Sequence, residues 1–323
     1  MGWLASLKKS RAVASVIRWI DAEAGADTLD AESDRVDLLR VLPFIVLHLA
    51  VFLVFWVGVS AVAVWAAVGL FVVRMLAVTG IYHRYFSHRT YRLNRFWQFV
   101  AALLGNSAVQ RGPLWWAAHH RHHHRCADQP GDPHSPKQLG FWRAHVLWLT
   151  TPKNFPTRRK YVEDWMRFPE LVFLNRFSML VPLGLLGLCL LAGWLLGTFV
   201  PSTGTSALQM GVWGFVISTV ALFHATATIN SLDHMIGTRR YDTPDTSRNN
   251  FILAILTMGE GWHNNHHHYA STARQGFYWW QWDPTYYLLV VLSWVGIVKD
   301  LKPLPAEARA RGQIRRRMDQ ESV

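Results

Sequence analysis

The chain has 323 residues, of which 51% are hydrophobic and 17% charged, and it contains two cysteines. The charged share lies well below the ~25% that is usual in soluble domains, and the composition excludes collagen-like, disordered and disulfide-stapled classes. Cys126 and Cys189 form no CxxC pair, so they cannot build a zinc ribbon or a four-cysteine iron–sulfur site. The net charge of +12 suggests nucleic acid until the positions of the basic residues are considered.

Residues 1–38 form a polar segment that we expect in the cytoplasm. Lys8 and Lys9 are followed by only a short apolar stretch, which Arg18 and Asp21 interrupt. A secretory signal would instead place its basic residues before a continuous apolar core. We therefore expect no such signal here.

Four apolar runs follow, and each is long enough to cross a hydrocarbon core of ~30 Å as a helix. A tight turn at 57–60 separates the first pair, and a polar loop at 201–205 separates the second. We expect an all-α integral membrane protein with four transmembrane helices in two hairpins and a cytoplasmic helical cap. The predicted spans are residues 39–57, 59–82, 177–200 and 208–230, within a membrane domain of residues 39–301.

Lysine and arginine indicate the orientation of these spans. They lie before the first span, between the hairpins and after the last span, whereas neither hairpin turn contains one. Basic residues collect on the cytoplasmic side of membrane proteins, so both termini and the long middle loop should be cytoplasmic. The basic surface then faces anionic membrane lipid, and no nucleic-acid partner is expected.

Arg74 is the exception, because it lies inside the second predicted span, where a charge is costly. A charge at such a place is a candidate functional residue by default. We expect a non-functional role instead, in which the side chain snorkels toward the cytoplasmic headgroups.

The chain contains 16 histidines, and most of them fall in four clusters. Each cluster lies at the cytoplasmic end of a predicted span or in a cytoplasmic loop, so the topology brings all four to one level of the membrane. The clusters are His83–His88, His120–His124, Asn230–His234 and His263–His267.

The spacing within the clusters is typical of metal ligands. Positions i, i+3 and i+4 share one face of a helix, so each HxxHH motif can aim three imidazoles at one point. His83 and His88 are five apart, which suits a helix end. The spaced positions give nine nitrogen ligands, enough for two ions: His83, His88, His120, His123, His124, His234, His263, His266 and His267. Imidazoles without thiolates suit iron, copper, nickel or zinc rather than magnesium or calcium.

The remaining histidines fit this pattern less well. A lone histidine within a span, such as His48 or His224, is more often packed or hydrogen-bonded than bound to metal. His119, His122 and His268 adjoin the clusters but fall off the repeated spacing, so they are left out of the predicted ligand set. Metal buffering by a histidine-rich loop is the alternative to a dedicated metal centre, but it predicts one low-complexity loop rather than spaced motifs at span ends.

These motifs resemble the histidine boxes of the membrane-bound fatty-acid desaturases, specifically the delta-9 acyl-CoA type. The resemblance covers roughly residues 39–301 and rests on His83-Arg-Tyr-Phe-Ser-His88, His120-Arg-His-His-His124, Asn230 to His234, and Gly259-Glu-Gly-Trp-His-Asn-Asn-His-His267. It implies two iron ions held by the nine histidines, with Asn230 reaching one ion through a water. It also implies that two hydrogens are removed from an unactivated methylene pair while dioxygen and two electrons are consumed. Zinc is a possible substitute for iron in recombinant protein.

The resemblance further implies a kinked apolar tunnel that presents one carbon pair of a fatty acyl chain to the metals. Gln110, Trp116 and Thr226 match the positions that shape this kink in the family. Ordinary packing at the membrane interface is the alternative role for the three side chains.

Two departures from the family pattern concern the acyl carrier. His119 stands where the animal enzymes carry an aspartate, and the neighbouring polar positions become Arg111 and Ala118. Ala227 stands where those enzymes have a tryptophan that meets the acyl carbonyl. The stretch Gln110-Arg-Gly-Pro-Leu-Trp looks more like bacterial members, some of which act on lipid-bound chains. The expected substrate is therefore a long acyl chain carried by coenzyme A or by a lipid, in a bacterial inner membrane.

The chain shows no cytochrome-b5-like haem segment and no ferredoxin cysteine pattern, so we expect a separate electron donor. A cytochrome b5, ferredoxin or rubredoxin with its reductase would serve. The candidate parts of the donor's dock include Arg125, Arg158, Arg159 and Lys160, although for any one of them a solvated, lipid-facing loop is the favoured interpretation. The basic tail, residues 302–323, is expected to be solvated or lipid-facing, with a dock for an acidic redox partner as its alternative role.

Three other functions compete with a membrane desaturase. An integral-membrane hydroxylase would use the same histidine iron chemistry, but membrane alkane hydroxylases carry glutamates inside their boxes, which these boxes lack. A soluble ferritin-like desaturase would need two Glu-x-x-His motifs, and Glu260-Gly-Trp-His263 is the only copy near the candidate site. A membrane metal transporter would hold its ligands near the bilayer midplane, whereas these histidines collect at one face.

Overall fold

A computed structural model describes residues 11–24 and 33–310 of the chain. The regular structure of these residues is helical, with isolated bridges but no strand. Lys8, Lys9 and the tail residues from Arg311 onward lie outside the described residues.

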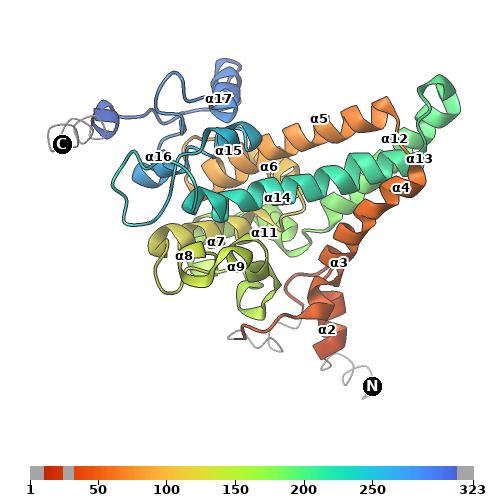
Figure 1. Ribbon diagram of the computed structural model, residues 1–323, viewed down its shortest axis with the longest axis horizontal. Helices are drawn as coiled ribbons and strands as arrows, with labels where there is room; N and C mark the ends of the chain where they lie inside the picture. Colours follow the sequence, from red (N-terminus) through yellow and green to blue (C-terminus); the bar gives the residue numbers. More distant parts are fainter. Residues whose placement is uncertain (1–10, 25–32, 311–323) are drawn as a thin grey trace.

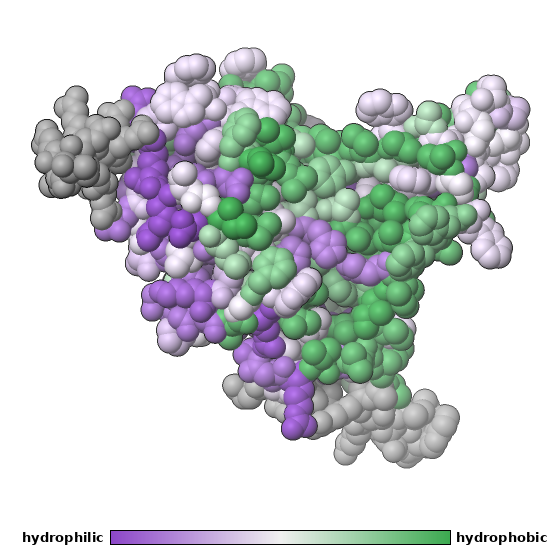
Figure 2. Space-filling view, viewed as in Figure 1, coloured by the Kyte–Doolittle hydropathy of each residue, from purple (hydrophilic) through white to green (hydrophobic). Residues whose placement is uncertain are grey.

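Four helices are long and apolar enough to cross a membrane, which confirms the predicted all-α fold: Leu38–Val57, Ala61–Ser87, Leu180–Phe199 and Ala207–His234. The first comprises α3 (Leu38–Leu49), η2 (Ala50–Leu53) and α4 (Val54–Val57), and the second comprises α5 (Ala61–Ala77) and η3 (Val78–Ser87). The third is α12 (Leu180–Phe199), and the fourth comprises α13 (Ala207–Gln209), η8 (Met210–Ile217), α14 (Ser218–Asn230) and η9 (Leu232–His234). The four run together in Figure 1, and Figure 2 shows hydrophobic residues gathered over this part of the molecule.

The two hairpin turns meet at the end of the bundle that lies away from the histidine clusters (Figure 1). Gly58 ends the first helix with φ at 68°, a left-handed conformation that glycine adopts at little cost. Ser60 then caps α5, and its hydroxyl lies 2.8 Å from the Thr205 hydroxyl of the other turn. Trp213 also donates to the Gly58 carbonyl at 2.9 Å. These contacts fix one hairpin against the other.

The second membrane helix continues past the predicted end at residue 82 as a π-helix, η3, which reaches Ser87. The amide of His88 bonds to the carbonyl of His83 at 3.2 Å, five residues back. The backbone hydrogen bond therefore joins residues five apart at this point, instead of the four of an α-helix. Two histidines that an α-helix would turn apart are thereby placed on the same face.

The other helices, apart from the one in the second hairpin turn, form a cap, defined as the described residues that lie outside the four membrane helices and the two hairpin turns. Its part between the hairpins contains α6 (Arg95–Asn106), α7 (Pro113–Cys126), α8 (Pro136–Leu139), α9 (Phe141–His145), η4 (Leu147–Thr150), η5 (Pro152–Asn154), η6 (Arg159–Tyr161), α10 (Glu163–Met166) and α11 (Pro169–Arg176). α2 (Arg11–Ile17) precedes the first hairpin and η7 (Pro201–Thr203) lies in the second turn, while α15 (Phe251–Leu256), α16 (His263–His268) and α17 (Pro284–Trp294) follow the last span. Figure 1 shows α7, α8, α9, α15, α16 and α17 gathered at one end of the bundle.

An aromatic core joins the cap to the second membrane helix. Phe86 is fully buried, and its ring lies 5.2 Å from that of Trp165 and 4.9 Å from that of Tyr85. Tyr82 packs so closely on α6 that a Cβ on Gly105 would lie 2.2 Å from its ring. Burial of each such aromatic side chain contributes roughly 1.5–3 kcal/mol, so η3 is rigidly held where its histidines lie.

Arg74 does not snorkel, and that expectation was wrong. Its side chain is 1% exposed and turns into the protein. The guanidinium donates to the hydroxyls of Ser218 and Thr219, at 2.5 and 2.8 Å, and to the Ser107 carbonyl at 3.2 Å. Oxygen atoms from neighbouring helices thus replace the water that snorkelling would have supplied.

Candidate metal centre

Five of the predicted ligands form one group, which we call the five-histidine group: His83, His88, His120, His124 and His266. Their nitrogens all lie within 4.8 Å of one another. The Nε2 atom of His266 lies 3.0 Å from that of His83 and 2.9 Å from that of His124. The Nε2 atoms of His88 and His120 are 2.7 Å apart. Helices η3, α7 and α16 thus meet around one point.

The other four form a second group, the four-histidine group: His123, His234, His263 and His267. Their nitrogens also lie within 4.8 Å of one another, and the Nε2 atoms of His234 and His263 are 3.1 Å apart. Here α7 and α16 meet the end of the last membrane helix.

Each HxxHH motif divides between the groups, so the expectation that a motif aims three imidazoles at one point was wrong. On α7, His120 and His124 belong to the five-histidine group and His123 to the four-histidine group. On α16, His263 and His267 belong to the four-histidine group and His266 to the other. Adjacent helical positions differ by about 100° in direction, so the i+3 and i+4 imidazoles face two different points.

The spacing within each group fits nitrogen ligands of a metal ion. Two nitrogens bound to one ion at ~2.1 Å, with a right angle between the bonds, lie about 3.0 Å apart. The Nε2 pairs above are separated by 2.7 to 3.1 Å. The all-imidazole donor set suits iron, copper, nickel or zinc. That the nine histidines bind metal stays a prediction, which this geometry supports.

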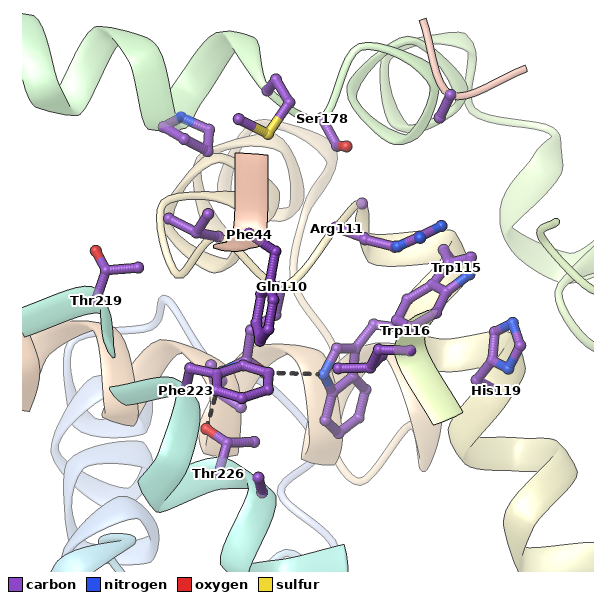
Figure 3. Close-up of a pocket in the computed structure, with 18 of the residues that line it drawn as sticks. Phe44, Gln110, Arg111, Trp115, Trp116, His119, Ser178, Thr219, Phe223 and Thr226 are labelled. Carbon is purple, nitrogen blue, oxygen red and sulfur yellow. Dashed lines mark hydrogen bonds between the residues drawn. The ribbon is translucent and has the colours of Figure 1, made fainter. Parts of the chain in front are cut away.

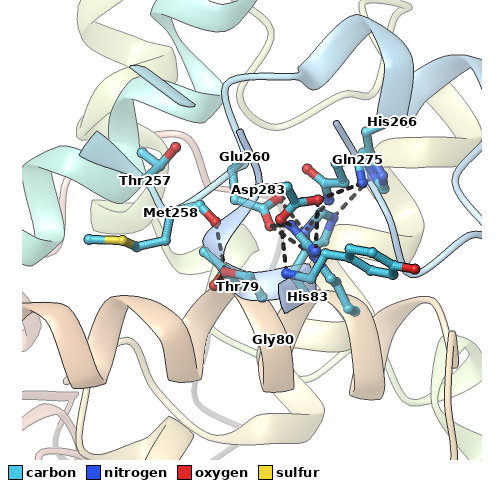
Figure 4. A network of polar contacts seen from close by, with 12 residues as sticks. Thr79, Gly80, His83, Thr257, Met258, Glu260, His266, Gln275 and Asp283 are labelled. Atoms are coloured by element: carbon cyan, nitrogen blue, oxygen red, sulfur yellow. Dashed lines mark hydrogen bonds and ion pairs between the residues drawn. The ribbon is translucent and has the colours of Figure 1, made fainter. Parts of the chain in front are cut away.

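Four carboxylates bond to the opposite ring nitrogen, Nδ1, of four of these histidines. The pairs are His83 with Glu260 at 2.5 Å, His123 with Asp132 at 3.0 Å, His234 with Asp128 at 2.9 Å and His267 with Asp245 at 2.8 Å. A proton held on Nδ1 leaves the Nε2 lone pair directed at the centre of its group. Figure 4 shows the Glu260 pair within its polar network. Sequence reasoning missed the four as a set, although Glu260 lies within a quoted motif.

Protonation also favours metal binding. Burial, and then the neighbouring imidazoles, lower the pKa of several predicted ligands well below the usual range of histidine: His88, His120, His124, His263 and His266. These rings are neutral at pH 7 and can donate their lone pairs. Burial alone would raise the pKa of Asp128, but the hydrogen bond and charge interaction with His234, together with the hydrogen bonds from Ser135 and Thr246, outweigh burial and hold the pKa below the usual range. The carboxylate is therefore ionised.

His134 is a further buried histidine at this place that the spacing did not identify. Its ring lies 4.4 Å from that of His123, and its Nδ1 has no hydrogen-bond partner among the described residues. Burial lowers its pKa to about 3, so it is neutral. His123, Asp132 and His134 could themselves hold an ion. Because two of the three already belong to the four-histidine group and its carboxylates, they form no separate site.

A cavity of about 900 Å³ connects the histidines with the membrane helices. His83, His120 and His263 line it, as does Asn230, which lies one turn before His234. Its other walls include apolar side chains of the spans, among them Phe44, Leu47, Leu186 and Phe215. The cavity can therefore hold a long apolar molecule beside the two groups.

Gln110, Trp116 and Thr226 lie together in this cavity (Figure 3). The Gln110 amide donates to the Thr226 hydroxyl at 2.9 Å and accepts from the Trp116 indole at 3.3 Å. The Trp116 ring stacks on His120 with ring centroids 5.1 Å apart. The structure thus brings the three residues together beside the five-histidine group. Their role in shaping a kink stays a prediction.

Three of the residues that depart from the family pattern, Arg111, His119 and Ala227, line the same cavity. His119 Nε2 lies 3.2 Å from the Pro156 carbonyl, and burial lowers the pKa of this histidine well below the usual range. The Arg111 guanidinium lies over the rings of Trp115 and Phe155, at 4.8 and 5.0 Å, and burial lowers its pKa to about 10. Arg111 therefore remains a cation at neutral pH.

The residues of the predicted dock for an electron donor have different partners in the structure. Arg125 and Lys160 both lie over the ring of Tyr161, with their charged groups 5.0 and 5.2 Å from the ring centroid. Arg159 instead forms an ion pair with Glu23 at 3.1 Å. Arg125 follows His124 directly on α7, so this basic pair lies next to the histidine groups.

Comparison with known proteins gives one consistent result. The family model described as fatty acid desaturase matches residues 60–289. A hex-5-enoyl-[acyl-carrier protein] acetylenase of Moorena producens is 34% identical over 82% of this chain and 84% of its own length. An acyl-CoA 5-desaturase of Anemone leveillei is 36% identical over 80% of this chain and 74% of its own. An sn-2 palmitoyl-lipid 9-desaturase of a Nostoc species is 34% identical over 77% of this chain and 86% of its own.

Proposed function

This chain belongs to the fatty acid desaturase family, and we propose that it introduces a cis double bond at the delta-9 position of a long saturated acyl chain. The observation that carries the proposal is the pair of histidine groups that face one long, largely apolar cavity. The hydrogens removed from two adjacent methylenes, together with two electrons and two protons, would reduce dioxygen to two waters. The name of the Nostoc relative supports the delta-9 position.

We propose that each histidine group holds one iron ion, which would supply the activation of dioxygen. Asn230 would reach the ion of the four-histidine group through a water, because it lines the cavity one turn before His234. Zinc would fit the same imidazole ligands in recombinant protein. The carboxylates on Nδ1 would keep the rings oriented toward the ions.

The protein's own contribution is to position the chain. An unactivated C–H bond has no acidic proton, so side-chain acid–base catalysis cannot break it. The cavity walls exclude water and align one carbon pair with the metals. The hydrogen-bonded trio of Gln110, Trp116 and Thr226 would set the bend of the chain, since it lies beside His120.

Replacement of Gln110 by leucine should break both hydrogen bonds of this trio. We expect the rate to fall on the order of 10- to 100-fold, because a shift of about 1 Å in the reacting carbons is enough to do so. The double bond should also spread over neighbouring positions, which mass spectrometry of the product esters would show. Gln129→Leu, at an exposed site, is the matched control. An unchanged rate and bond position in Gln110→Leu would contradict the role of the trio.

We place both termini and the histidine end of the molecule in the cytoplasm, in a bacterial inner membrane. The support is the absence of lysine and arginine from both hairpin turns, at 57–60 and 201–205. The acyl carrier would be coenzyme A or a lipid. The relatives' names include an acyl-carrier protein, coenzyme A and a lipid, so the family scaffold accepts different carriers.

The electron donor would dock over Arg125 and Lys160, the basic pair that packs on Tyr161. In the double variant Arg125→Glu, Lys160→Glu, we expect the KM for an acidic donor to rise on the order of tenfold at low salt. The difference should shrink as salt screens the charges. Steady-state oxidation of the reduced donor measures both effects. Arg92→Glu, exposed elsewhere on the cap, is the control, and an equal rise in both variants would contradict this dock.

Fatty-acid analysis of a desaturase-deficient host that expresses the chain tests the whole function. New monounsaturated acids with a double bond at carbon nine are the expected result. Hydroxylated chains instead would assign the chain to the hydroxylases. Absence of any product, with iron bound and with donor and reductase supplied, would contradict the proposal.

A further inference from the structure

The two histidine groups differ in the carboxylates that bond to them. In the four-histidine group, three of the four imidazoles pair through Nδ1 with an aspartate: Asp132, Asp128 and Asp245, at 3.0, 2.9 and 2.8 Å. In the five-histidine group, Glu260 on His83 is the one carboxylate so placed among the described residues. Asp233 lies beside His234, but its carboxylate has no hydrogen-bond partner among the described residues, so it is not one of the carboxylates that bond to a ligand imidazole.

The neighbours of these carboxylates also leave more negative charge beside the four-histidine group than beside the five-histidine group. The three aspartates are held by neutral donors: Asp128 by Thr246 and Ser135, Asp132 by the amides of Asp128 and His134, and Asp245 by Thr243 and Ser247. No described arginine or lysine forms an ion pair with any of them. Glu260 is instead paired with the buried Arg84 guanidinium at 3.2 Å. Arg84 also pairs with Asp283 at 2.9 Å, so it offsets part of the Glu260 charge.

A carboxylate on Nδ1 raises the basicity of the imidazole and increases its affinity for a metal ion. A negative charge in a buried site also attracts a cation more strongly than it would in water. Three such charges, none of them in an ion pair with an arginine or lysine of the described residues, act on the four-histidine group, whereas one partly offset charge acts on the five-histidine group. Ligand number alone predicts the reverse order, because the five-histidine group offers one more imidazole.

We propose that the two metal positions are unequal, and that Asp128, Asp132 and Asp245 make the four-histidine group the tighter one, which fills first. The three aspartates are positioning residues that act through His234, His123 and His267. The proposal rests on metal binding by the histidines, which the proposed function also needs, but not on desaturation. It can therefore fail while the desaturase assignment stands, and the reverse also holds.

Stepwise titration of the full-length, metal-free protein with Co²⁺ tests the order of filling. Equilibrium dialysis gives two dissociation constants, and the visible spectrum of Co²⁺ reports the coordination of each ion. We expect the first ion to bind at least tenfold more tightly than the second. His88→Ala, in the five-histidine group, should retain the tight constant, and His263→Ala, in the other, should lose it. Equal constants in the wild type, or loss of the tight constant in His88→Ala, would overturn the proposal.

A matched pair of variants tests the carboxylates themselves. Asp245→Asn keeps the shape and a hydrogen-bond acceptor for His267 but removes the charge, and Glu260→Gln does the same for His83. We expect Asp245→Asn to weaken the tight step by 10- to 100-fold and to leave the weak step unchanged. Glu260→Gln should affect only the weak step. Melting of the metal-free proteins shows whether each variant folds, and Asp128→Asn replaces Asp245→Asn if that variant does not. Weakening of both steps, or of neither, would overturn the role of the aspartates.

Discussion

Replacement of His266 by alanine is expected to abolish desaturation and to remove one of the two proposed metal ions. The Nε2 atom of this residue lies 3.0 Å from that of His83 and 2.9 Å from that of His124, so it joins the ligands from η3 and α7. Its loss leaves the proposed metal ion of this group with four imidazole ligands and none from α16. We expect activity to fall below detection, by more than ~100-fold, because loss of even an outer partner of a ligand costs 10- to 100-fold.

The measurement pairs fatty-acid analysis in a desaturase-deficient host with the metal content of the purified protein. His268→Ala is the matched control, since it removes a histidine of the same helix that stacks on Tyr241, with centroids 4.0 Å apart, outside both groups. That variant should keep its metal and its product. Activity in His266→Ala, or an equal loss in His268→Ala, would contradict the assignment of the five-histidine group.

The spacing of the histidines predicts which residues assemble, because the pattern depends on local helix geometry. The nine residues chosen from the sequence are the nine that form the two groups. Spacing does not predict how they divide, since the sorting of His123 from His124 depends on the angle at which α7 meets α16. The five-residue gap between His83 and His88 is explained only by the π-helix, which the sequence pattern did not indicate.

The carboxylates and Arg74 mark the limit of prediction from sequence. Asp128 bonds to His234, which lies 106 residues further along the chain, and the amide of Thr246 bonds to the same carboxylate. Such contacts depend on the loop of Asp128 and the loop of Thr246 meeting at the end of the last membrane helix, which no local pattern encodes. In the sequence Arg74 looks like an isolated charge, because its partners Ser218 and Thr219 are on the other hairpin.

Replacement of Arg84 by methionine is expected to lower the free energy of unfolding by about 3–5 kcal/mol, because it leaves buried charges without their partner. The guanidinium is 1% exposed and lies 3.2 Å from Glu260 and 2.9 Å from Asp283. It also donates to the Ala273 carbonyl at 2.8 Å. Glu260 bonds in turn to His83, so the same change should disturb a predicted metal ligand. Thermal unfolding in detergent, with metal content, measures both effects.

Arg95→Met provides the contrast, because its ion pair with Glu170 lies at the surface, with the arginine side chain 66% exposed. Water and salt screen such a pair, so no measurable change in melting temperature is expected. If charge burial is the cause, Asp283→Asn should restore part of the stability lost in Arg84→Met, since one fewer unpaired charge then remains. Equal destabilisation by the two arginine variants would show that packing of the long side chain, rather than its charge, holds this network. Failure of Asp283→Asn to restore stability would indicate the same, and would leave Glu260 dependent on Gln275, which donates to it at 3.0 Å.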